Sequence, residues 1–136
     1  MRVKVHLLAS LILIVSSYSY AEEEEAAEAA ESNAQYVELK PSFVTNYQAH
    51  RMGYLKADVT LMVKDQKTAD AVDLHMPAIR NNLVMLFSRQ DENMLNSTEG
   101  KMHLREEALQ EVVAALQSEG APNNVEDVLF TSFLVD

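Results

Sequence analysis

The sequence of 136 residues contains no cysteine, and only three glycines and three prolines. The absence of cysteine excludes a disulfide scaffold, a thiol nucleophile and a cysteine-ligated zinc site. So little glycine and proline argues against a collagen-like or loop-dominated chain, and the length fits one domain. Basic residues are also few, because 21 acidic residues face 11 basic ones and leave a formal charge of −10. Such an acidic surface repels phosphate backbones, which argues against nucleic-acid binding.

The first 21 residues have the composition of a secretory signal peptide. A basic start is followed by a largely apolar stretch over residues 7–15 and by small and polar residues up to Ala21, which is the order of a cleavable signal. A stretch of this length gives about 13 Å of helix, well short of the roughly 30 Å core of a bilayer. We therefore expect export with cleavage after Ala21. The alternative is an uncleaved anchor with Tyr18 and Tyr20 at the membrane interface.

Residues 22–35 form a strongly acidic segment, with six glutamates among residues 22–31. Glutamates four positions apart on a helix repel each other, so we interpret the segment as a solvated, flexible tether. The alternative is a frayed leader with no role. We expect the folded domain over residues 36–136, where 15 acidic residues remain against 9 basic ones once the leader and the tether are set aside.

Alternating apolar and polar residues predict three strands. The clearest alternation runs over residues 54–63, and a weaker one covers 37–45, as expected for strands with one buried face. Pro41 cannot donate a hydrogen bond, so it marks an edge position or a bulge in the weaker strand. Residues 125–135 are rich in β-branched and aromatic residues with apolar side chains on both faces, which predicts a strand covered on both sides or facing a partner.

Residues 68–88 have the period of a helix instead. Five apolar residues recur at steps of three and four: Val72, Met76, Ile79, Leu83 and Leu86. This stripe predicts a helix with one buried face, and Thr68 is the expected N-cap. Pro77 interrupts the stripe, so we expect a kink or a restart with the proline in the first turn of the second half.

A second helix is expected over residues 98–118. Its core-facing residues are predicted to be Leu104, Ala108, Leu109, Val112, Ala115 and Leu116. Gly120 and Pro122 end it. The order strand, strand, helix, helix, strand predicts an α+β domain, with two or three helices on one face of a small antiparallel sheet.

Patterns that carry catalysis or metal binding are almost absent from the sequence. His50, His75 and His103 lack metal-ligand spacing, no serine lies in a nucleophile elbow, and no glycine-rich loop is present to hold phosphate. We therefore expect no enzyme activity, no cofactor and no metal. A zinc site made by these three histidines and a small hydrolase are the alternatives. Residues 96–98 match a glycosylation sequon, which a helix cap explains more simply.

Five short segments occur in the order and spacing of a known family. They are YVELKPSF at Tyr36–Phe43, YLKADV at Tyr54–Val59, the P-x-I-R segment Pro77–Arg80, the E-G-K-x-x-L-R-E segment Glu99–Glu106 and the F-T-x-F segment Phe130–Phe133. At these segments the chain resembles the flagellar basal body-associated FliL family, over about residues 36–136. The resemblance implies a stomatin/SPFH-like fold that can form rings, in a non-enzymatic accessory protein that supports torque and motility.

The resemblance also implies partners and a location. Flagellar stator and basal-body proteins are the expected partners, in the periplasm at the basal body, with peripheral association with the inner membrane. Family members typically carry a transmembrane helix before the domain, whereas the leader of this chain is predicted to be cleaved. The alternative function is a generic periplasmic binding or assembly-factor module without a flagellar partner.

Arg80 is the first candidate partner-binding residue. An arginine beside a kink in a helix can hold the carboxylate of a neighbouring subunit bidentately, in a way that lysine does not reproduce. The alternative is an internal ion pair with Asp73, with Asp127 or with a helix end.

The strand over residues 125–135 supplies the other candidates. Strict alternation puts Val128, Phe130 and Leu134 on one face, and Leu129, Phe133 and Val135 on the other. Because helices cover only one face of a small sheet, we expect Leu129, Phe133 and Val135 to form an exposed apolar patch for partner binding or ring assembly. The alternative is that a further segment of the chain packs there.

Overall fold

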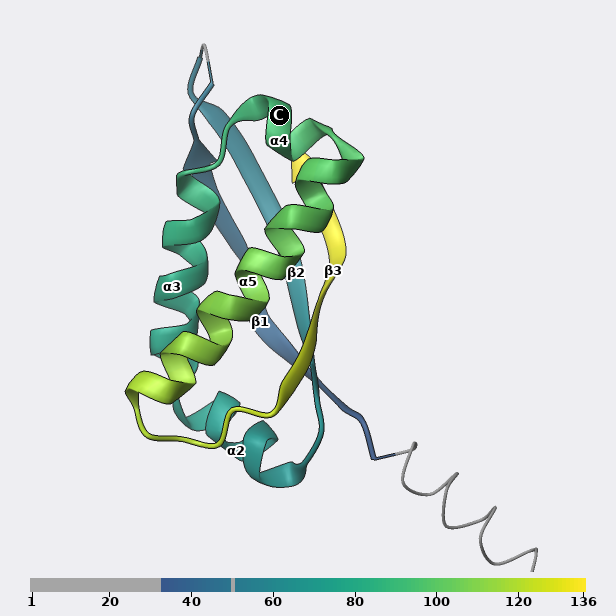
Figure 1. Cartoon of the computed structure of the whole chain (residues 1–136). Coiled ribbons are helices and arrows are strands. Elements are labelled where there is room, and N and C mark those ends of the chain that lie inside the picture. The colour runs from purple at the N-terminus through teal and green to yellow at the C-terminus, as the bar shows by residue number, and fades with distance from the viewer. Residues whose placement is uncertain (1–32, 50) are drawn as a thin grey trace, which may run out of the picture. The chain divides into compact units, whose positions relative to one another are not determined.

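The computed structural model describes residues 33–49 and 51–136 (Figure 1). The predictions for the signal peptide 1–21, for cleavage after Ala21, for most of the tether 22–35 and for His50 lie outside the described residues. Within these residues, a three-stranded antiparallel sheet in the order β1-β2-β3 is combined with four helices. The predicted α+β class is therefore confirmed.

The elements follow one another in the expected order, with one additional short helix. They are β1 (Gln35–Tyr47), β2 (Gly53–Val63), α2 (Gln66–Leu74), α3 (Met76–Ser88), α4 (Glu92–Asn96), α5 (Thr98–Ser118) and β3 (Val125–Val135). Helices α3 and α5 lie across one face of the sheet (Figure 1), where α3 contacts β1 and α5 contacts β3. The core lies between these helices and the face of the sheet that they cover. We call this the inner face, and the opposite one the outer face.

Strand β2 shows the predicted alternation with one buried face. Its inward side chains are almost completely buried, namely Leu55, Ala57, Val59, Leu61 and Val63. Strand β1 pairs with β2 in two stretches, and the register shifts between Leu39 and Phe43. Lys40, Pro41 and Ser42 therefore lie opposite Asp58 alone. The irregularity predicted at Pro41 is confirmed.

The interrupted helix also matches the prediction, except at its start. Helix α2 ends at Leu74 and α3 begins at Met76, with Pro77 in the first turn of α3. Thr68 is not the N-cap, because the extended residue Asp65 precedes the helix and its carboxylate accepts the backbone N–H of Thr68 at 2.7 Å. The buried Thr68 hydroxyl instead accepts the backbone N–H of Asn124 at 3.2 Å and joins α2 to the start of β3.

Helix α5 has the predicted bounds, and a short helix missed by the sequence reasoning precedes it. Ser97 caps α5 by accepting the N–H of Gly100 at 3.0 Å, which agrees with the interpretation of residues 96–98 as a cap. In the same way, Asp91 caps α4 by accepting the N–H of Met94 at 2.9 Å. The two helices pack tightly, since a Cβ at Gly100 would lie 2.0 Å from the carbonyl oxygen of Met94.

The predicted faces of β3 are wrong beyond Phe130. Phe130 pairs with Val59, whereas Ser132 pairs with the next residue of β2, Asp58, so Thr131 is an extra residue in β3. One extra residue moves all later side chains to the opposite face. The helix-facing row is therefore Val128, Phe130, Phe133 and Val135, and Leu129 and Leu134 lie on the outer face. The expected single patch of Leu129, Phe133 and Val135 does not exist as one face.

All four phenylalanines of the chain form one row through the core. Ring centroids are 5.5 Å apart for Phe43 and Phe87, 6.0 Å for Phe87 and Phe130, and 5.3 Å for Phe130 and Phe133. The row crosses from β1 through α3 to β3. A cation lies over each end, because the Arg80 guanidinium is 4.1 Å from the Phe43 centroid and the Lys101 ammonium is 5.4 Å from the Phe133 centroid. Such pairs add to the stability that burial alone provides.

We predict that Ile79→Ala lowers the free energy of unfolding by roughly 2–4 kcal/mol, as expected for a buried large-to-small change. Ile79 is 0 % exposed and is the first residue of the buried stripe of α3. Met85→Ala on the same helix is the control, since Met85 is 58 % exposed. Denaturant unfolding of both variants measures the effect, and equal losses would contradict the assignment of the buried face.

Candidate functional site

Asp58 occupies the middle of the central strand, at the point where both outer strands are irregular. Lys40, Pro41 and Ser42 of β1 lie opposite it on one side, and the extra residue Thr131 of β3 lies next to it on the other. Bulges at matching positions bend a sheet and re-aim its side chains, and they are frequent beside functional sites. The half-buried Asp58 side chain points to the outer face of the sheet, away from the helices.

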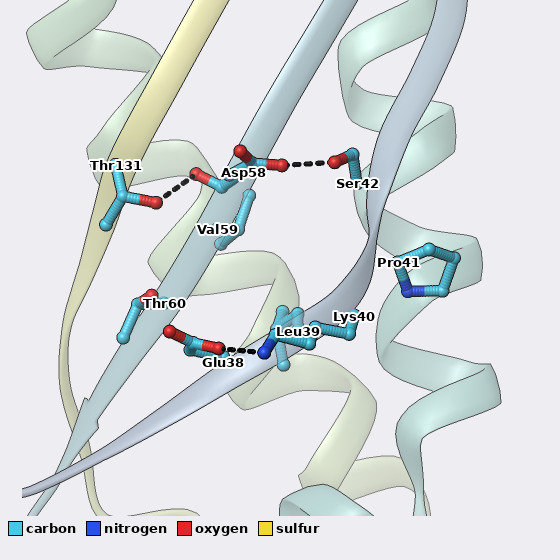
Figure 2. A pocket seen from close by; sticks show the side chains of 9 residues that line it. All are labelled: Glu38, Leu39, Lys40, Pro41, Ser42, Asp58, Val59, Thr60 and Thr131. Carbon is cyan, nitrogen blue, oxygen red and sulfur yellow. Dashed lines mark hydrogen bonds and ion pairs between the residues drawn. The ribbon is translucent and has the colours of Figure 1, made fainter.

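The two irregularities are tied to Asp58 by hydrogen bonds. The Ser42 hydroxyl donates to the Asp58 carboxylate, and the Thr131 hydroxyl donates to the Asp58 backbone oxygen at 3.4 Å (Figure 2). Beside them, the Lys40 ammonium lies 2.6 Å from the Glu38 carboxylate, and this hydrogen bond raises the pKa of Lys40. These groups surround a hollow of about 710 Å³ that extends over Thr60.

This hollow combines hydrogen-bonding groups with apolar side chains. Its lining offers two carboxylates, one ammonium and three hydroxyls, and one of these hydroxyls, that of Ser42, is bonded to the carboxylate of Asp58. Among the described residues, no three histidine, cysteine, aspartate or glutamate side chains gather as metal ligands. The sequence signalled this hollow only through Pro41, because the shift at Thr131 has no counterpart in the pattern of residue types.

Arg80 contacts its own chain at the irregular part of β1. Its Nη1 donates to the backbone oxygen of Pro41 at 2.7 Å and its Nη2 to that of Ser42 at 3.5 Å. The predicted alternative of an ion pair with Asp127 is wrong, because Asp127 pairs with Arg105. A guanidinium has five N–H donors, so Arg80 keeps donors for a further acceptor.

A second hollow of about 370 Å³ lies between α5 and β3, at the other edge of the sheet from Arg80. We call it the α5–β3 groove, and its lining residues are Thr98, Lys101, Met102, Arg105, Leu129, Phe130 and Phe133. The structure thus brings together two of the predicted partner residues, Leu129 and Phe133, from the two faces of β3. Val135 follows on the helix side and is partly buried against the core.

One end of the α5–β3 groove is fixed by a bidentate ion pair. Arg105 Nε donates to Asp127 Oδ1 at 2.8 Å, and Nη2 contacts the second carboxylate oxygen. These hydrogen bonds lower the pKa of the Asp127 carboxyl below its usual value of 3.8. Asp127 also accepts the N–H of Val128 at 2.8 Å, so the pair joins the middle of α5 to the start of β3.

The whole domain matches a protein family. The family model for "Flagellar basal body-associated protein FliL" covers residues 36–135, which is nearly all of the described chain. The chain belongs to the FliL family. Its resemblance to that family, first suggested by five short segments, is therefore confirmed, and the family ties the chain to the flagellar basal body and to motility.

Curated relatives agree with this assignment. The chain is 29 % identical over 119 residues to the "Flagellar protein FliL" of Escherichia coli strain K12, covering 88 % of this chain and 76 % of the relative. It is 30 % identical over 98 residues to the protein of the same name from Aquifex aeolicus, covering 71 % of this chain and 58 % of the relative. In residues 33–49 and 51–136 of this FliL-family chain, no helix has both the length and the apolar composition needed to cross a bilayer.

We predict that the contribution of Asp127 to stability disappears in acid. A carboxyl whose pKa is lowered on folding stabilises the native state above its usual pKa, and this stabilisation is lost as the pH falls through the lower, folded value. The difference in unfolding free energy between the wild type and Asp127→Asn should therefore shrink as the pH falls below 3.8.

Denaturant unfolding at neutral pH and at several values below the usual aspartate pKa measures this difference. The exposed Asp73 on α2 supplies the control variant, Asp73→Asn. A gap between wild type and Asp127→Asn that stays constant with pH would contradict the role of the ion pair.

Proposed function

We propose that this chain is a non-enzymatic accessory protein of the flagellar motor, which associates with the stator units at the basal body and supports torque and motility. The observation that carries the proposal is the family match over residues 36–135. Relatives named "Flagellar protein FliL" in Escherichia coli and in Aquifex aeolicus support it. The stomatin/SPFH-like fold that the resemblance implies stays a prediction.

The proposal assigns partner contact to the β3 side of the domain. Leu129 and Phe133 line the α5–β3 groove and Val135 continues along the same strand, so these three predicted residues still mark one region although they do not share a face. Arg80 lies at the opposite edge of the sheet. There it supports the irregular part of β1, and its remaining donors stay available for a neighbouring carboxylate.

Leu129→Asp should reduce both motility and the recovery of stator proteins with the purified chain, because it places a charge in an apolar contact surface. Leu129 is preferable to Phe133 for this test, since Phe133 also belongs to the aromatic row of the core. Leu74→Asp is the matched control, because Leu74 is 74 % exposed and lies at the end of α2. Swimming and co-purification are measured in a strain that lacks the wild-type gene.

Two results would argue against this function. Unchanged motility in the strain without the gene would remove the motor role. Recovery of a non-flagellar periplasmic protein in place of stator proteins would favour the generic assembly-factor module. Ring formation is the alternative contact of the same region. It is followed by sedimentation at increasing salt, which would promote it because salt screens the repulsion between acidic copies.

We also propose a periplasmic location, with the signal peptide removed after Ala21. Mass spectrometry of the protein isolated from its host should then find Glu22 as the first residue. An intact Met1 in the membrane fraction would instead show that the N-terminal segment is retained as an anchor.

A further inference from the structure

The backbone of β3 offers hydrogen-bonding groups at a free edge of the sheet. Tyr54 of β2 and Asp136 exchange both backbone hydrogen bonds, at 2.9 and 3.0 Å. In an antiparallel pair such residues alternate with residues whose N–H and C=O point away from the partner strand. Val135 and Phe133, which lie opposite Leu55 and Ala57, therefore direct their backbone groups toward the free edge.

The opposite edge of the sheet is protected at the irregular part of β1. Pro41 has no N–H to donate, and Arg80 occupies the carbonyl oxygens of Pro41 and Ser42. Proline and irregular pairing are the usual means by which an edge strand is protected from pairing with another chain. At Phe133 and Val135, beyond the extra residue Thr131, neither a proline nor a strand from the described residues protects the edge of β3.

The side chains beside the free edge define what would fit there. A residue paired with Phe133 points its side chain to the helix side of the sheet, as Phe133 does. That side is the α5–β3 groove, where Met102, Phe130 and Phe133 supply apolar side chains and Leu129 adds one from the outer face. An added strand would thus place every second side chain in the groove and the intervening ones on the outer face.

The charges of the groove are opposite in sign to that of the whole chain. Its two charged lining residues, Lys101 and Arg105, are both cations, whereas the chain carries a formal charge of −10. Lys101 extends over the Phe133 ring, and Arg105 keeps Nη1 donors beyond the two nitrogens that contact Asp127. Acidic side chains on either side of an apolar one would meet these cations.

We propose that the edge of β3 binds an extended segment of a partner protein as a fourth, antiparallel strand. On its helix-facing side, that segment carries an apolar residue between two acidic residues. Main-chain hydrogen bonds to Phe133 and Val135 supply affinity, and the groove and its cations supply selectivity. This inference specifies the partner contact of the proposed function, and it can be tested without any flagellar protein.

The test uses a blocked peptide, Thr-Glu-Thr-Leu-Thr-Glu-Thr, titrated into isotopically labelled protein that is produced from the full chain. Amide shifts of β3 and α5 should change, whereas those of β1 should not. The matched peptide Thr-Lys-Thr-Leu-Thr-Lys-Thr should bind at least about tenfold more weakly. Long-range attraction to the acidic chain alone would give the reverse order, so the comparison separates groove recognition from net charge.

Methylation of single peptide nitrogens tests strand pairing directly. In the proposed register the leucine N–H points to β3 and the N–H of the threonine that follows it points away. N-methyl leucine should therefore abolish binding, whereas N-methylation of that threonine should leave it within about twofold. Equal effects of the two methyl groups, or no shift changes with the parent peptide, would overturn strand addition. A dimer in which the β3 amides are already hydrogen-bonded to a second copy, and which leaves no shift changes for the peptide to cause, would also overturn the proposal.

The contribution of the cations is tested by reversing one of them. Lys101→Glu should lower the affinity for the glutamate peptide and raise the affinity for the lysine peptide, each by about tenfold. The control is Lys67→Glu, an equal charge change at an exposed residue of α2. Equal effects of the two variants would contradict selectivity through the groove. If the peptide binds as described but stator proteins are not recovered from cells, strand addition is supported and the stator proteins are excluded as its partner.

Discussion

The extra residue Thr131 is the constraint on which the rest of the domain depends. Because it lies outside the regular pairing of β3 with β2, Phe130 and Phe133 both face the helices, although three positions separate them. Their rings complete the row that starts at Phe43 and passes through Phe87. Without the extra residue, Phe133 would point to the outer face and the row would end at Phe130. The extra residue therefore determines both the pairing of β3 and the extent of the aromatic row.

On the outer face, Ser42 and Thr131 are held together by Asp58 of the central strand. Asp58 accepts hydrogen bonds from Ser42 at its carboxylate and from Thr131 at its backbone oxygen, so each irregular strand is attached to β2 where its regular pairing fails. Unpaired polar groups would otherwise be left at these places. The hollow beside Asp58 and the groove beside Phe133 are therefore two consequences of how β2 is paired, one on each side of the sheet.

Sequence reasoning recovered the elements whose periodicity has one clear solution. The buried alternation of β2, the restart at Pro77 and the bounds of α5 follow from contrasts between apolar and polar residues or from proline. The register of β3 has no such contrast, because residues 125–135 carry apolar side chains on both faces. Strict alternation is then the default, and only the packing of Phe130 and Phe133 against the rest of the core decides otherwise. Two of the residues predicted for partner binding, Leu129 and Phe133, line the α5–β3 groove, but the faces of β3 on which they lie were not predicted.

The two edges of the sheet show how a small domain can direct association. A sheet of three strands has a high proportion of edge, and each edge left open is a site for pairing with other chains. Here α3 supplies Arg80 to the irregular part of β1, whereas α5 supplies Lys101 and Arg105 to a groove beside β3. In both places a cation from a helix lies over a phenylalanine at one end of the same aromatic row. At β1 that cation satisfies backbone oxygens of its own chain, and at β3 it borders an edge whose backbone groups face outward. The two edges therefore differ in the backbone groups that they present, and the proposed strand addition uses the edge whose groups face outward.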